Sequence, residues 1–125
     1  MLTIQARVGA GAAFLDRCQP DWIRQIDLQK LDMSDPQDCM FGQIFGSFEE
    51  GIFRIELGSH ARQEALPEES LGFEAIADQS HTAQMIAEYA ALTDEWRRVI
   101  LERRRVSWNW FHDLIGLFAP RYAAT

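Results

Sequence analysis

The chain has 125 residues, a mass of 14.4 kDa and a formal net charge of −7. This length and an apolar fraction of 47% fit one domain, residues 1–125, and the acidic balance disfavours general nucleic-acid binding. Two cysteines are too few for a disulfide-framed secreted domain, and no apolar stretch is long enough to span a membrane, so we expect a reduced, cytoplasmic protein.

The first 30 residues predict two helices. Thr3 can cap the first one, whose apolar positions recur at helical spacing and form one stripe: Ile4, Val8, Ala12 and Leu15. Pro20 suits the first turn of a second, short helix, whose apolar face consists of Trp22, Ile23 and Ile26. These stripes mark the faces that we expect to be buried.

A third helix is predicted over residues 39–45, at the start of the stretch CMFGQIFGSF. Two overlapping capping solutions precede it. One uses Ser34 with Gln37, and the other uses Asp35 with Pro36 and Asp38. The sequence leaves both open.

One face of this helix carries small or slender residues, namely Cys39, Gly42, Gln43 and Gly46. Such a face lets another helix approach closely inside a soluble core, although Gly46 can instead be the C-cap. Gln43 is a polar amide in an apolar run. We expect it to hydrogen-bond to neighbouring backbone groups, the alternative being contact with a ligand.

The middle of the chain is irregular and acidic. Residues 47–58 alternate like a strand, but a single strand would have no pairing partner, so helix or turn is preferred. A polar loop containing Pro67 follows, and residues 71–77 return apolar side chains to the core. Residues 46–80 contain eight acidic and two basic residues; we interpret them as a solvated segment, the alternative being mimicry of nucleic acid.

The strongest helix is predicted over residues 82–105. Thr82 can cap it, and its apolar stripe consists of Met85, Tyr89, Leu92, Trp96 and Val99 or Ile100. Its predicted end is basic, because Arg103, Arg104 and Arg105 would lie where the helix dipole favours cations. The alternative use of these arginines is phosphate binding, with bases stacked on Trp108 or Trp110.

Residues 106–125 form an aromatic C-terminal segment, with a helix expected over residues 106–118 that packs on the long helix or on a second copy of the chain. Its seven large apolar residues cover most of the helix circumference, so they cannot all face one small core. We therefore predict a two-fold homodimer, the alternative being burial by the same chain. The predicted interaction residues are Trp108, Trp110, Phe111, Leu114, Ile115 and Phe118.

The chain offers weak candidates for chemistry. Cys39 could act as a nucleophile near a helix N-terminus, but its apolar neighbours favour a buried, unreactive thiol. The histidines His60, His81 and His112 are scattered, and they form no spacing with the cysteines that would hold a metal. We therefore predict no catalytic, cofactor or metal site.

The chain resembles a set of uncharacterised small α-helical proteins of actinobacteria and their phages. The resemblance covers roughly residues 5–105 and rests on GAAFLD at 11–16, Pro20 with Trp22, IDLQKLD at 26–32, CMFGQIFG at 39–46, LGF at 71–73 and YAALTDEW at 89–96. The aromatic C-terminal segment departs from that pattern. The resemblance implies phage or prophage origin and carries no chemistry.

These observations together predict an all-α domain of four to six helices with an irregular acidic middle segment. The function class they favour is a non-enzymatic protein-interaction module that acts through a protein partner or through self-association. The alternative is a nucleic-acid-directed module, acting through the arginines and tryptophans at 103–110 or through acidic mimicry by residues 46–80.

Overall fold

A computed structural model describes residues 3–54, 68–77 and 82–118, with residues 107–118 described by their backbone alone. Its elements are α1 (Ile4–Cys18), α2 (Trp22–Gln25), α3 (Met40–Phe45), the 3-10 helix η1 (Glu68–Leu71) and α5 (Thr82–Phe118). Residues 48–54 are also helical. No strand occurs in these ranges, so the all-α prediction is confirmed for them.

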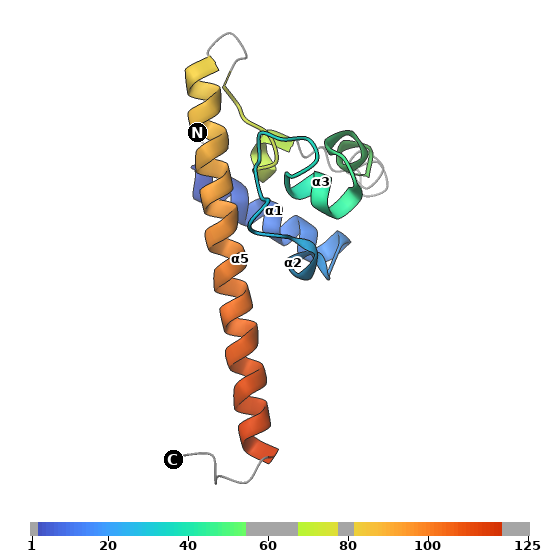
Figure 1. The fold of residues 1–125 in the computed structure, drawn as a ribbon, viewed down its shortest axis with the longest axis vertical. Coiled ribbons are helices and arrows are strands. Elements are labelled where there is room, and N and C mark those ends of the chain that lie inside the picture. The colour runs from blue at the N-terminus through green and yellow to red at the C-terminus, as the bar shows by residue number, and fades with distance from the viewer. Residues whose placement is uncertain (1–2, 55–67, 78–81, 119–125) are drawn as a thin grey trace.

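The molecule is organised around α5, which has 37 residues and is therefore about 55 Å long. Figure 1 shows α1 crossing this helix, with α2 and α3 lying on one side of it. The last turns of α5, drawn in red, extend well beyond the other helices. The predicted long helix is therefore the spine of the fold.

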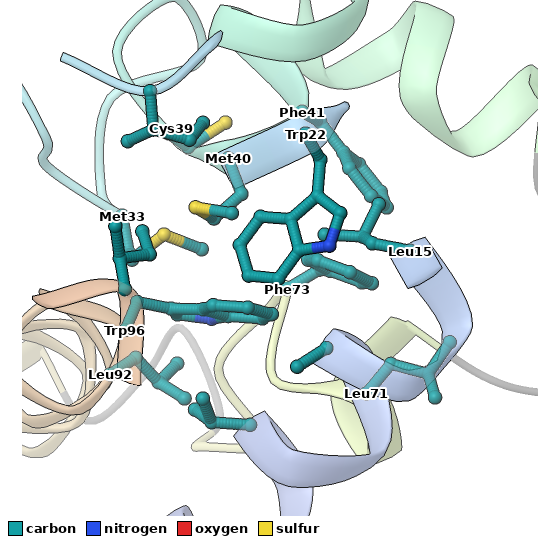
Figure 2. Close-up of a cluster of buried hydrophobic side chains, with 14 of the residues drawn as sticks. Leu15, Trp22, Met33, Cys39, Met40, Phe41, Leu71, Phe73, Leu92 and Trp96 are labelled. Atoms are coloured by element: carbon teal, nitrogen blue, oxygen red, sulfur yellow. The ribbon is translucent and has the colours of Figure 1, made fainter. Parts of the chain in front are cut away.

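The core lies where α1, α2, α3 and residues 71–75 meet α5, and aromatic rings fill its centre. The Phe73 ring lies 5.4 Å from that of Trp96 and 4.2 Å from that of Phe41, and Trp22 meets Trp96 edge-on at 5.8 Å. Figure 2 shows these side chains gathered with Leu15, Met33, Met40 and Leu92. Aromatic pairs at such separations add to the stabilisation from apolar burial.

The apolar stripes predicted from helical spacing are largely buried. Val8, Ala12 and Leu15 are fully buried on α1, and Leu92, Trp96 and Ile100 are fully buried on α5. Thr3 caps α1, since its hydroxyl accepts a hydrogen bond from the Ala6 amide at 3.0 Å. Residues 71–77 also behave as predicted, because Leu71, Phe73 and Ala75 are buried.

The start of α3 differs from both predicted capping solutions. Cys39 is the N-cap, and its Sγ accepts a hydrogen bond from the Gly42 amide at 3.3 Å. Asp35 instead closes a separate turn, in which its carboxylate accepts from the Gln37 and Asp38 amides and its carbonyl accepts from the Cys39 amide at 2.9 Å. This turn ends before α3 begins. Asp35 therefore caps the turn, and the Cys39 thiol caps α3.

The small-residue face of α3 does not receive another helix. A side chain added at Gly42 would collide with the backbone of Pro36 and Gln37, so this face packs against the preceding turn. Gly46 is the C-cap, with φ of 101° in the left-handed region that favours glycine. The predicted helix–helix contact is therefore wrong, while the C-cap alternative is confirmed.

Two further predictions concern helix limits. Residues 48–54 are helical, which confirms the preference for helix there, and residues 55–58 lie outside the described residues. Residues 106–118 are helical as predicted, but they continue α5 without a break, so they cannot fold back onto it as a separate helix. No glycine or proline occurs from residue 82 to residue 115, and nothing therefore ends the helix at the arginines.

Candidate functional site

The predicted basic helix end is an internal segment of α5 that fastens α1 and α2. The Arg103 Nη1 donates to both carboxylate oxygens of Asp16, at 2.6 and 2.8 Å. Asp16 also accepts a hydrogen bond from the Trp22 indole at 2.9 Å, and the Arg103 guanidinium lies 5.6 Å from the centre of the Trp22 ring. One turn of α5 is thereby tied to both N-terminal helices.

Asp16 is the charge that balances Arg103. Partial burial raises the pKa of its carboxyl, but the hydrogen bonds from Arg103 and Trp22 outweigh burial, so the pKa lies below the usual value. The Asp16 carboxyl is thus ionised near neutral pH.

Arg104 closes the end of α2. Its Nη2 donates to the carbonyls of Ile23 and Ile26, each at 2.6 Å. The last carbonyls of a helix lack internal partners, and a cation beside them is favourable. The sequence predicted that the arginines interact with the dipole at the end of α5. That prediction is wrong, because α5 continues beyond them and Arg104 contacts the carbonyls at the end of α2 instead.

These contacts weaken the nucleic-acid interpretation of the triple arginine. Arg103 is ion-paired with Asp16, and Arg105 is ion-paired with Glu102 at 2.9 Å on the surface of the same helix, so two of the three charges are already balanced. The side chains of Trp108 and Trp110 lie outside the described residues, so the predicted stacking is untested. Residues 46–80 are described only in part, and acidic mimicry stays a prediction.

A cavity of about 430 Å³ lies beside the arginines. It is formed where α2 and the turn before it face α5, and its lining residues are Pro20, Asp21, Ile23, Arg24, Arg103 and Arg104. Three arginines and one aspartate therefore line one cavity on a chain whose net charge is −7.

The predicted interaction residues all lie on the last turns of α5, beyond these contacts. Trp108, Trp110, Phe111, Leu114, Ile115 and Phe118 belong to its backbone-only segment, so their side chains lie outside the description. Just before that segment, Leu101 is 52% exposed and Val106 is 56% exposed. Among the described side chains of α5, that of Arg104 is the last toward the C-terminus to hydrogen-bond to another element.

Cys39 has a structural position. It is 2% exposed, caps α3, and lies 3.7 Å from the Pro36 carbonyl. Burial raises the pKa of its thiol and outweighs the hydrogen bonds from backbone amides, so the nucleophilic thiolate is disfavoured. Among the described residues, no group of three or more acidic, histidine or cysteine side chains could hold a metal. His60 and His81 and the side chain of His112 lie outside the description.

Gln43 has the backbone-binding role that the sequence predicts. Its Oε1 accepts from the Asp27 amide at 2.6 Å, and its Nε2 donates to the carbonyls of Asp27 at 3.2 Å and Asp38 at 3.0 Å. The side chain thus joins α3 to the segment that follows α2.

A buried ion pair went unnoticed in the sequence. Arg7 is 3% exposed, and its Nη2 contacts a Glu88 oxygen at 2.9 Å. Arg7 also donates to the carbonyls of Glu69 at 2.7 Å and Glu74 at 2.8 Å. The sequence contains one indication that Arg7 is buried, because position 7 lies one helical turn before position 11 on the buried face of α1.

Glu88 completes this network from α5. Its carboxylate accepts from the amides of Ile76 and Ala77 as well as from Arg7. Partial burial raises the pKa of Glu88, but these hydrogen bonds outweigh burial and hold the pKa below its usual value. The network joins α1, the segment after η1 and α5, so its role is to hold the fold together.

The chain matches no protein-family model, and searches among curated proteins and solved structures give no match. Within residues 3–54, 68–77 and 82–118, no helix combines the length and apolar character that crossing a membrane requires.

Proposed function

We propose that this protein is a non-enzymatic interaction module that self-associates as a two-fold dimer through the C-terminal third of α5. The supporting observation is the continuation of α5 to Phe118, beyond the last described hydrogen bond that ties it to α2. The remaining residues, 107–118, add about 18 Å of helix.

The spacing of apolar residues supports the same proposal. One stripe of α5 faces the rest of the chain. It consists of the buried residues Leu92, Trp96 and Ile100 and the partly buried Arg103. Steps of four and three residues continue this line to positions 107, 110, 114 and 117, and the last three are Trp110, Leu114 and Leu117. Alternating steps of three and four are typical of helices that pair with another helix.

Energetic reasoning favours a partner for this segment. Burying one large apolar side chain is worth about 1.5–3 kcal/mol, and residues 107–118 include seven such residues. Soluble monomers rarely leave a contiguous apolar surface of this kind in water, and two-fold pairing is the commonest way to cover it.

The remaining parts of the proposal rest on other grounds. A non-enzymatic role is supported by the capping position of Cys39, the sole nucleophile candidate that the sequence suggested. The resemblance to actinobacterial and phage proteins is the basis for proposing a phage or prophage origin. The presence of only two cysteines in the sequence is the basis for proposing a cytoplasmic location. Nucleic-acid binding is the less supported function, since Arg103 and Arg105 are ion-paired within the chain.

Sedimentation of matched variants tests the proposal. Leu114→Glu places a charge on the continued stripe, whereas Asn109→Glu places the same charge on the polar stripe of the same helical segment. The full chain and Asn109→Glu should sediment as dimers, and Leu114→Glu should sediment as a folded monomer. A full chain that remains monomeric at about 100 µM, well above the dissociation constant of a specific dimer, would refute self-association.

A further inference from the structure

The cavity beside α2 has an electrostatic character unlike that of the chain as a whole. Its lining carries three arginines and one aspartate, so its formal charge is positive although the chain carries −7. A volume of about 430 Å³ lies within the range of pockets that hold small organic ligands.

The three arginines are not equivalent. Arg103 is balanced by the carboxylate of Asp16, whereas Arg104 donates to the carbonyls of Ile23 and Ile26 and has no ion-pair partner among the described residues. Arg24 is exposed on α2 and has no ion-pair partner among the described residues. Two guanidinium charges at one cavity are therefore available to an anion.

The other lining groups suit an organic ligand and not a bare ion. Pro20 and Ile23 offer apolar surface, and the Asp21 carboxylate is an acceptor that makes no capping hydrogen bond to α2. That carboxylate would repel a second anionic group but can accept hydrogen bonds from hydroxyl groups. A lone phosphate would also leave most of the volume unfilled.

We propose that this cavity binds a small phosphate monoester with a hydroxylated body, of the sugar-phosphate class. A phosphate monoester carries close to two negative charges near pH 7, which matches the two guanidinium groups, those of Arg24 and Arg104, that lack a described ion-pair partner. Arginine presents donors in a planar fork that fits phosphate oxygens. The sugar hydroxyls would face Asp21, with the carbon skeleton against Ile23.

Titration calorimetry on the full chain, with glucose 6-phosphate, inorganic phosphate and glucose as separate probes, tests this proposal. Glucose 6-phosphate should bind saturably, with a dissociation constant of about 1 mM or less, and more tightly than either other probe. The Arg24→Gln variant should bind it about tenfold more weakly, the loss expected for one charge-assisted hydrogen bond. The matched control is Arg54→Gln, an exposed arginine outside the cavity, and it should bind like the unaltered chain.

Amide chemical shifts locate the site independently of self-association. Glucose 6-phosphate should shift the amides of residues 21–24 and 103–104, and Arg24→Gln, whose side chain is exposed, should keep the native spectrum elsewhere. The proposal is overturned if no saturable binding occurs below about 10 mM, or if Arg24→Gln binds as tightly as the unaltered chain. Equal affinity for inorganic phosphate or for glucose overturns it too, because either result removes the need for a phosphorylated sugar.

Discussion

Replacing Arg7 by methionine should lower the free energy of unfolding by about 3–5 kcal/mol, the cost typical of breaking a buried ion pair. Methionine retains most of the aliphatic stem, so the loss comes mainly from the guanidinium group. Three acceptors lose their donor, namely the carbonyls of Glu69 and Glu74 and the carboxylate of Glu88.

The structure places the expected loss toward the lower end of this range. The Glu88 side chain is 16% exposed and keeps hydrogen bonds from two backbone amides, so water and these amides partly compensate for the missing arginine. A domain of this size has a free energy of unfolding of about 5–15 kcal/mol, so the variant should still fold but with a much smaller margin.

Urea denaturation followed by tryptophan fluorescence measures the effect, since Trp22 and Trp96 are fully buried. Arg54→Met is the matched control, because Arg54 forms an ion pair with Glu50 but is 62% exposed, and it should cost less than about 0.5 kcal/mol. A loss below about 1 kcal/mol for Arg7→Met would refute the inference that this network holds α1 to α5.

The same ion pair predicts a pH dependence. Because the pKa of Glu88 is lower in the folded chain than in the unfolded chain, its contribution to stability is complete above the unfolded pKa and is lost as the pH falls through the folded pKa. The difference in stability between the unaltered chain and Arg7→Met should therefore shrink on acidification, and a constant difference would contradict this assignment.

Two further predictions concern single positions. Gly11→Ala should destabilise by about 1–3 kcal/mol, because an added methyl group would collide with a backbone carbonyl and an indole ring, whereas Gly9→Ala, with open space around it, should be neutral or gain up to about 1 kcal/mol in thermal denaturation. Equal effects at the two glycines would contradict the described packing. In the native protein Cys18, which is exposed, should react rapidly with a thiol reagent while Cys39 reacts only after denaturation; rapid native labelling of Cys39 would revive the catalytic interpretation.

The helical stripes could be predicted because the apolar residues that one face of a helix buries recur at helical intervals in the sequence. Val8 with Leu15, and Leu92 with Trp96, recur at helical intervals, and both pairs are buried as predicted. The backbone role of Gln43 followed from the general rule that buried amides find backbone partners.

Other features depend on partners distant in sequence. Arg7 and Glu88 are 81 residues apart, and no local pattern links them. The true end of α5 was missed because three arginines before a serine resemble a helix terminus, while Arg103 and Arg104 find their partners on α1 and at the end of α2. The Cys39 cap was missed because a thiol is an uncommon cap.

The position of α5 at the C-terminal end of the described fold has a consequence for synthesis. Three residues of α5 are translated after α1, α2, α3 and residues 71–75. They are Trp96, at the centre of the core, and Arg103 and Arg104, which hydrogen-bond to α1 and to the end of α2. Ribosomes add about 5–20 residues per second, so the nascent chain spends about 1–5 s between residue 77 and residue 104 without its central helix. Until Trp96 is translated, Trp22 and Phe73 lack the indole ring against which they pack, and chaperones that bind exposed apolar segments can recognise the growing chain.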